Sequence, residues 1–176
     1  MNCFHLDLNI DPLSRLDLLV RKRHTKINFE DINPELIKFF ETLNLRIHLA
    51  EIFYSHPYYD SPIHIDTLPG DFTKLNWQYR GSRSKMNWYR VLDLDKKDIS
   101  ITPIGTNFVS YSRSEVEIIE TNDIKFPSLV QAGVPHNIKN DYEERWVLSI
   151  VFKFIVDNRR PTMKESIVLF RDLITD

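Results

Sequence analysis

Short segments rich in β-branched and aromatic residues follow one another from about residue 46 to residue 156, and they constrain the fold more than any other feature of the sequence. Typical examples are LRIHLAEIFY, MNWYRVLDL and RWVLSIVFKF. Residues that favour turns separate most of these segments, among them Pro69-Gly70, Gly81-Ser82 and Asn122-Asp123. No long helical pattern alternates with them, which argues against a doubly wound parallel sheet. We therefore expect a mainly β (α+β) fold, a sandwich or barrel packed on a helical layer.

Two helical patterns flank this β-rich core. The first, at about 33–44, opens on Asn33-Pro34 and continues with apolar residues at helical spacing. The second, at about 162–174, opens on Thr162-Met163-Lys164-Glu165, which has the pattern of a capping box. A chain of 176 residues has a common length for one domain. We expect a single domain over 1–176.

Composition bounds the partners and the compartment. The 23 Lys and Arg residues nearly balance the 25 Asp and Glu residues, so no overall charge attracts nucleic acid or an acidic membrane. Cys3 is the only cysteine, which excludes an internal disulfide and a cysteine-based zinc site and fits a reducing compartment. The N-terminus lacks the order of a signal peptide, and no apolar run approaches the roughly 20 residues of a membrane span. We expect a soluble, cytoplasmic protein.

The stretch SPIHIDT places His64 and Asp66 two residues apart. In a strand the two side chains project on the same side, so an imidazole and a carboxylate could share one metal ion. The pattern also arises by chance, and taken alone it indicates an ordinary polar pair on a strand. A second copy, His5-Leu6-Asp7, lies at the N-terminus, where chains fray, and we expect no site there.

The late stretch QAGVPHNIKNDYEERWVLSIVF offers a third ligand, His136, between two apparent strands. Two histidines and one carboxylate form a facial triad that leaves three positions of an octahedral ion open. Arg145 begins the last β-rich segment, and alternation places it on one face with Val147, Ser149 and Val151. A guanidinium on the interior face of a barrel demands an anionic partner. A dicarboxylic cosubstrate would supply one, with one end on the metal and the other paired with the arginine.

This order of HxD, then His, then Arg over a run of short strands resembles the Fe(II)/2-oxoglutarate-dependent oxygenase superfamily, from roughly Ile63 to Phe154. The resemblance implies a double-stranded β-helix core (jelly-roll, cupin-like) with flanking helices. It also implies that His64, Asp66 and His136 bind Fe(II) and that Arg145 binds the distal carboxylate of 2-oxoglutarate.

The same family commonly uses a further polar side chain near the cosubstrate, on the strand after HxD. Asn76 in KLNWQY is our candidate, and Ser149, on the face of Arg145, is a second cosubstrate-binding candidate. Thr73, Gln78, Tyr79 and Tyr89 compete with Asn76 for this role, and of these four Tyr79 is kept among the candidate cosubstrate-binding residues.

The activity that the resemblance implies is a dioxygenase reaction that consumes O2, hydroxylates a C–H bond and releases succinate and CO2. A nucleobase demethylase of the AlkB type would carry a second arginine six residues after Arg145, where this chain has Val151. We therefore expect a small-molecule, amino-acid or peptidyl substrate.

Two other hypotheses remain open from the sequence. Gly133-Val134-Pro135-His136 with Asn140 also resembles the second cupin motif, although cupins usually carry HxH in their first motif. The chain could thus be a cupin-like metal-binding isomerase or ligand-binding protein without oxygen chemistry. The other hypothesis is a noncatalytic β-domain that serves as a binding module.

Overall fold

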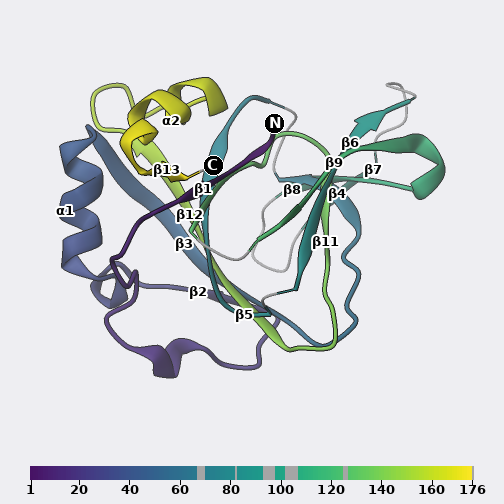
Figure 1. Ribbon diagram of the computed structural model, residues 1–176, viewed down its shortest axis with the longest axis horizontal. Coiled ribbons are helices and arrows are strands. Elements are labelled where there is room, and N and C mark those ends of the chain that lie inside the picture. The colour runs from purple at the N-terminus through teal and green to yellow at the C-terminus, as the bar shows by residue number, and fades with distance from the viewer. Residues whose placement is uncertain (67–69, 82, 93–97, 102–106, 125–126, 176) are drawn as a thin grey trace.

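Two antiparallel sheets form the body of the molecule, as the computed structural model shows (Figure 1). In Figure 1 both helices lie over the seven-stranded sheet, whereas the strands of the six-stranded sheet lie on the other side of the molecule. The structure describes residues 1–66, 70–81, 83–92, 98–101, 107–124 and 127–175.

The seven-stranded sheet has the order β13-β1-β10-β5-β12-β3-β2. One of its inner strands, β12, is buried along its first eight residues, which is why its sequence reads as a nearly continuous apolar run. The strands of this sheet are β1 (Cys3–Leu6), β2 (His24–Lys26), β3 (Leu45–Ser55), β5 (Thr73–Arg80), β10 (Ser128–Gln131), β12 (Arg145–Phe154) and β13 (Ile174–Thr175).

The six-stranded sheet has the order β7-β8-β4-β11-β6-β9. Its strands are β4 (Ile63–Asp66), β6 (Lys85–Val91), β7 (Asp98–Ile101), β8 (Asn107–Tyr111), β9 (Val116–Asp123) and β11 (His136–Lys139).

The connections between the sheets identify the architecture. The order β3-β12-β5-β10 in one sheet faces β4-β11-β6-β9 in the other, and the chain passes between the sheets at most steps from β3 to β12. This is the strand order of a jelly roll, or double-stranded β-helix. The predicted fold class, mainly β with a jelly-roll core and flanking helices, is confirmed.

Both helices begin at the predicted caps. Helix α1 (Pro34–Thr42) has Asn33 as its N-cap, and the Asn33 side chain accepts a hydrogen bond from the backbone of Glu35. Helix α2 (Met163–Leu169) has a complete capping box between Thr162 and Glu165. The C-terminal helical pattern predicts a longer helix than the structure has, because a 3-10 turn (Arg171–Leu173) and strand β13 follow α2.

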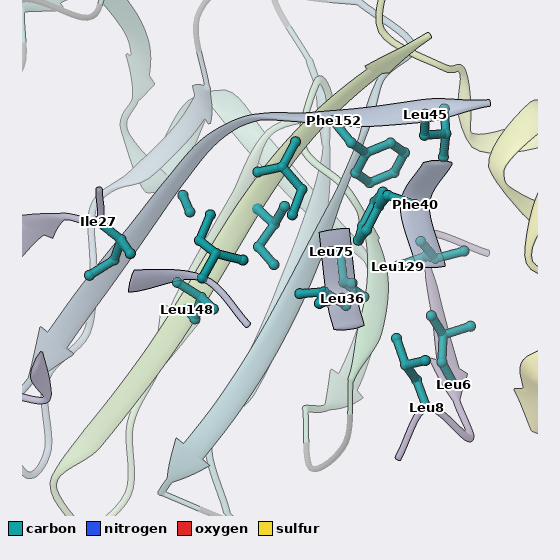
Figure 2. Close-up of a cluster of buried hydrophobic side chains, with 14 of the residues drawn as sticks. Leu6, Leu8, Ile27, Leu36, Phe40, Leu45, Leu75, Leu129, Leu148 and Phe152 are labelled. Atoms are coloured by element: carbon teal, nitrogen blue, oxygen red, sulfur yellow. The ribbon is translucent and has the colours of Figure 1, made fainter. Parts of the chain in front are cut away.

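The main hydrophobic core lies between the helices and the outer face of the seven-stranded sheet (Figure 2). Leu36 and Phe40 of α1 are fully buried there, against Leu75, Leu148 and other residues of the sheet. The aromatic rings of Phe40, Phe152 and Phe170 contact one another in this core. Burial of these side chains is the main force that holds the helices on the sheet.

A smaller core lies between the two sheets. It joins Cys3 and Val130 of the seven-stranded sheet to Met86 and Trp88 of the six-stranded sheet, with Ile124 in the same cluster. Inward positions near β4, β5 and β12 carry polar side chains, and these build the site described below.

The N-terminal segment differs from the expectation of fraying. Residues Cys3–Leu6 form strand β1, which pairs with β10 and β13, and His5 Nδ1 lies 2.9 Å from Ser128 Oγ. Local sequence does not indicate this strand, because its partners are more than one hundred residues away in the sequence. None of the helices in the described part of the chain has the length and apolar character needed to span a membrane.

Candidate metal and cosubstrate site

His64 and Asp66 project from strand β4 into the space between the sheets. Ile63 and Ile65 alternate with them and pack in a hydrophobic cluster on the other face of the same strand. On the adjacent strand β11, His136 lies directly opposite His64 in the register. The pairing of β4 with β11 therefore brings the two histidines together.

The three predicted metal ligands form one cluster. Each of His64, Asp66 and His136 offers a ligand atom, and these atoms lie within 4.8 Å of one another. The Nε2 atoms of His64 and His136 are 3.4 Å and 3.9 Å from the oxygens of Asp66. The side chain of His136 is 6% exposed, whereas those of His64 and Asp66 are 25% and 26% exposed. A ligand can therefore reach the cluster from the β4 side.

Backbone carbonyls fix the tautomer of both imidazoles. His64 Nδ1 donates to the carbonyl of Pro62 at 2.9 Å, and His136 Nδ1 donates to the carbonyl of Val134 at 2.8 Å. A carbonyl can only accept, so the proton of each neutral ring lies on Nδ1 and the Nε2 lone pair points toward Asp66. This arrangement is typical of histidines that bind a metal through Nε2.

The charges of the cluster are strongly coupled. Burial would raise the pKa of Asp66, but the Lys74 ammonium, then the hydrogen bond and the charges of the histidines, hold it well below its usual range. Burial and the neighbouring His64 lower the pKa of His136 to about 4. Burial also acts to lower the pKa of His64, but its hydrogen bond to Asp66 and the Asp66 charge give a net rise. An ionised carboxylate and a neutral His136 are the forms that bind a divalent cation.

Lys74 is the residue of this region that the sequence analysis missed. It lies on β5, in the opposite sheet, and its Nζ donates to Asp66 Oδ2 at 2.7 Å. This contact shows that the inner face of β5 looks onto the cluster. Alternation along KLNWQ places Lys74, Asn76 and Gln78 on one face, and the same rule that grouped the residues of β12 could have found it.

Arg145 is buried on the inner face of the same sheet, at 2% exposure. Its Nε donates to Gln78 Oε1 at 3.3 Å, and its Nη2 has no hydrogen-bond partner. Among the described residues no carboxylate lies within ion-pair distance, and burial lowers the pKa of Arg145 to about 10. Gly81, at φ +86°, leaves room for this side chain, because a Cβ there would lie 2.8 Å from Arg145 Cβ.

Asn76 and Ser149 also face the interior. They lie opposite each other in the register of β5 and β12, and both are buried. Asn76 Oδ1 has no hydrogen-bond partner, although buried side-chain oxygens normally have one. Two buried orphan atoms, Asn76 Oδ1 and Arg145 Nη2, therefore belong to side chains on the same inner face.

The structure does not bring Tyr79 to the cluster. Alternation along β5 places Tyr79 with Trp77 on the outer face, toward the main core, and its hydroxyl donates to Asp11 at 3.4 Å. Thr73 and Tyr89 also lie away from the cluster, because Thr73 contacts Met163 of α2 and Tyr89 lies on the outer face of the six-stranded sheet.

A polar network on that outer face connects the ends of β4 and β11. Asn137, next to His136, accepts hydrogen bonds from Asn87 at 2.8 Å and from the Tyr89 hydroxyl at 2.9 Å. Its own amide donates to Asp60, just before β4, at 2.6 Å. These bonds hold the two ligand-bearing strands in register.

Comparison with known proteins gives structural likeness alone. No protein-family model and no curated protein matches the chain. Among solved structures, E. coli ycfD has a TM-score of 0.44 and 20% identity, covering 78% of this chain and 32% of that chain. Vicilin from Capsicum annuum has a TM-score of 0.39 and 11% identity, covering 86% of this chain and 36% of that chain.

A Bacillus subtilis oxalate decarboxylase is a more remote match, with a TM-score of 0.32 and 10% identity over 67% of this chain and 26% of that chain. The chain thus spans about a third or less of the length of these solved chains. The assignment of the jelly-roll core is based on the strand order given above, and that of the His-Asp-His cluster on the distances.

Proposed function

We propose that this protein is an Fe(II)- and 2-oxoglutarate-dependent dioxygenase that hydroxylates a C–H bond of a small molecule, an amino acid or a peptidyl side chain. One observation carries the proposal. A partly exposed His-Asp-His cluster shares the barrel interior with a buried arginine that has no anionic partner among the described residues. A dicarboxylate that binds a metal at one end would satisfy both features.

The side chains present fit this metal and this cosubstrate. Two imidazole nitrogens and one carboxylate oxygen form a donor set that Fe(II) accepts, and three coordination positions are left for other ligands. The orphaned Nη2 of Arg145 can donate to a carboxylate that lies against Gln78. Asn76 can contribute its amide to the same ligand, with Ser149 opposite it.

Each residue then has a defined task. His64 and His136 would hold the metal through Nε2, with Asp66 as the third ligand. Arg145, kept in place by Gln78 and the space at Gly81, would fix the distal carboxylate and so orient the keto acid. With O2 as the oxidant, the bound metal would couple the oxidative decarboxylation of 2-oxoglutarate, which gives succinate and CO2, to hydroxylation of the substrate C–H bond. Trp88 and its neighbours would keep water out of one part of the interior.

A cupin-like metal protein without oxygen chemistry is the second candidate. The observation that favours it is that Arg145 already has a neutral partner in Gln78, so its burial does not by itself require an anion. Such a protein would bind the metal through the same three side chains and would show no dependence on 2-oxoglutarate.

The test is spectroscopic. Under anaerobic conditions, Fe(II) and 2-oxoglutarate added to the wild-type protein should give the weak visible charge-transfer band of a metal-bound keto acid. Asp66→Ala should abolish the band, and Arg145→Met should weaken it by lowering the affinity for 2-oxoglutarate. Arg80→Met is the matched control, because Arg80 stacks on Trp146 outside the site at 5.6 Å from the ring centroid and should leave the band unchanged.

The possible results separate the hypotheses. Bound iron without a band at saturating 2-oxoglutarate would contradict the dioxygenase proposal and favour the cupin-like candidate. Absence of bound metal in the wild type would contradict both and leave the noncatalytic binding module. If the band is present, release of succinate in the presence of candidate small molecules and peptides is the screen for substrate.

A further inference from the structure

Lys74 lies beside the cluster and has no task in the proposed function. The residue is 8% exposed, and its Nζ donates to Asp66 Oδ2 at 2.7 Å. Its neighbours in the register of the sheet, Val130 and Val151, are apolar and buried. A buried ammonium needs an anionic partner, and here that partner is the carboxylate proposed to bind the metal.

We propose that Lys74 couples the binding of the metal ion to the binding of the anionic cosubstrate. It weakens the binding of a divalent cation alone and strengthens the binding of the cation together with 2-oxoglutarate. This inference rests on the proposed function, since it takes 2-oxoglutarate as the cosubstrate.

The first step is the repulsion between Lys74 and a metal ion. The ammonium lies on Asp66 Oδ2, so a cation bound to Oδ1 would share one carboxylate with it. Like charges this close repel strongly where water is scarce. Because Lys74 is buried, its ammonium cannot move into bulk water when the metal arrives.

The second step is that Lys74 contributes charge more than orientation. Strand β4 is held on one side by β8 and on the other by β11, and the backbone N–H of Asp66 donates to the carbonyl of Ala132 at 3.3 Å. The backbone of Asp66 is therefore held in place whether or not Lys74 is present, and His64 and His136 remain within 3.4 Å and 3.9 Å of its carboxylate oxygens. Removal of Lys74 should strengthen metal binding by relieving repulsion, rather than weaken it by releasing Asp66.

The third step is the balance of buried charge. In the described part of the chain, the buried cations of the inner face are Lys74, which pairs with Asp66, and Arg145, which has no carboxylate within ion-pair distance. Glu51, another buried carboxylate, is already paired with His24 at 2.9 Å. A divalent metal ion alone adds to the net positive charge around the cluster, whereas a divalent metal ion together with a dianionic keto acid adds no net charge. Lys74 therefore favours the loaded site over the site with metal only.

The coupling has a functional consequence. Metal and 2-oxoglutarate would load together, and the protein would hold little iron when the cosubstrate is scarce. By linkage, the same factor must appear in both affinities: 2-oxoglutarate raises the affinity for metal as much as metal raises the affinity for 2-oxoglutarate.

The experiment uses Co(II) as an oxygen-stable probe and calorimetry on the full chain, with and without 2-oxoglutarate. Lys74→Met should bind Co(II) alone about tenfold more tightly than the wild type, a change of the size seen for residues that contact metal ligands. The enhancement of Co(II) affinity by 2-oxoglutarate should fall by about the same factor in this variant. Lys74→Arg should behave like the wild type because it keeps the charge.

Lys85→Met is the matched control, because Lys85 is exposed on β6 and its loss removes the same charge away from the site. It should bind Co(II) like the wild type. Lys74→Gln provides a second neutral variant, and circular dichroism of each variant shows that the fold is kept.

Equal Co(II) affinities and equal enhancement in the wild type and in both neutral variants would overturn the role of Lys74 and leave the proposed function standing. Weaker Co(II) binding in the neutral variants would also overturn it, in favour of a role in orienting Asp66. Failure of 2-oxoglutarate to change Co(II) affinity in the wild type, together with no charge-transfer band with Fe(II), would overturn the proposed function itself.

Discussion

The burial of the Arg145 guanidinium is unfavourable for folding. Its guanidinium is removed from water, with Gln78 as its partner and Nη2 without one. A buried charge with incomplete hydrogen bonding destabilises the folded state, and natural proteins keep such groups where function needs them. The unfavourable contact is therefore itself a reason to expect a ligand.

Replacing this arginine tests that reasoning at the level of one residue. Arg145→Met should raise the free energy of unfolding of the ligand-free protein by about 1–3 kcal/mol, because the desolvated, partly unpaired charge is removed and the apolar stem is kept. Denaturant unfolding measures the change, and Arg80→Met serves again as the control. A loss of stability of similar size would mean that the guanidinium has favourable contacts that compensate for its burial.

The residues of the site differ in how far the sequence could predict them. His64, Asp66 and His136 could be grouped because two of them share a strand and the third follows a turn next to a strand. Alternation along β5 could have grouped Lys74 with Asn76, whereas its contact with Asp66 depends on which β5 face looks across to β4. Tyr79 lies away from the cluster because it alternates with Asn76 and Gln78 along β5 and so faces the main core.

At the level of elements, the sequence predicts a helix or strand correctly where its signal lies in neighbouring residues. The caps of α1 and α2 depend on side chains within three residues of the helix start, and both are present. Strand β1 depends on β10 and β13, far along the chain, and no local pattern distinguishes it from a frayed end. Short strands whose partners lie far along the chain are therefore the elements that a single sequence reveals least.

The capping box of α2 predicts a pH-dependent contribution to stability. The Arg159 guanidinium and the backbone N–H of Thr162 lower the pKa of Glu165 to about 2, from an ordinary value of 4.5. A depressed pKa means that the folded state binds this proton less readily than the unfolded state. The stabilisation is complete above about 4.5 and is lost as the pH falls through about 2.

Glu165→Gln should therefore destabilise the protein at neutral pH, and the difference from the wild type should shrink as the solution is acidified through this range. Thermal unfolding at several pH values is the measurement. The control is Glu35→Gln, an exposed glutamate in the first turn of α1. A difference that stays constant from neutral pH to about 2 would show that the ionised carboxylate is not the source of the stabilisation.

At the level of the whole molecule, the seven-stranded sheet divides stability from chemistry. Its outer face carries the large apolar core with the helices (Figures 1 and 2). Its inner face carries the buried side chains of Lys74, Asn76 and Arg145. Alternation along each strand is enough to separate the two sets of side chains. The jelly roll and its helical layer follow from this alternation of side chains. The single domain over 1–176 stays a prediction.

The division predicts that a change on the outer face leaves the site intact. Phe40→Ala should lower the free energy of unfolding by about 3–5 kcal/mol, since Phe40 is fully buried against Phe152 and Phe170. Its Co(II) affinity, measured under conditions where the variant is folded, should equal that of the wild type. Phe29→Ala, at a side chain that is 58% exposed, should change stability by less than about 1 kcal/mol. A large change in Co(II) affinity would show that the two faces are not independent.

The register that places His136 opposite His64 also bears on how the chain folds. The two histidines belong to strands widely separated along the chain, and their contact closes one of the longer loops in the described part of the molecule. Contacts of high sequence separation form late, because the entropy of closing the loop must be offset first. A nascent chain that has emerged only as far as β10 would carry an intact HxD pair and no metal site. A metal ion could then bind the full cluster only after β11 has docked beside β4, so under the proposed function the topology would keep an unfinished chain from carrying a reactive metal.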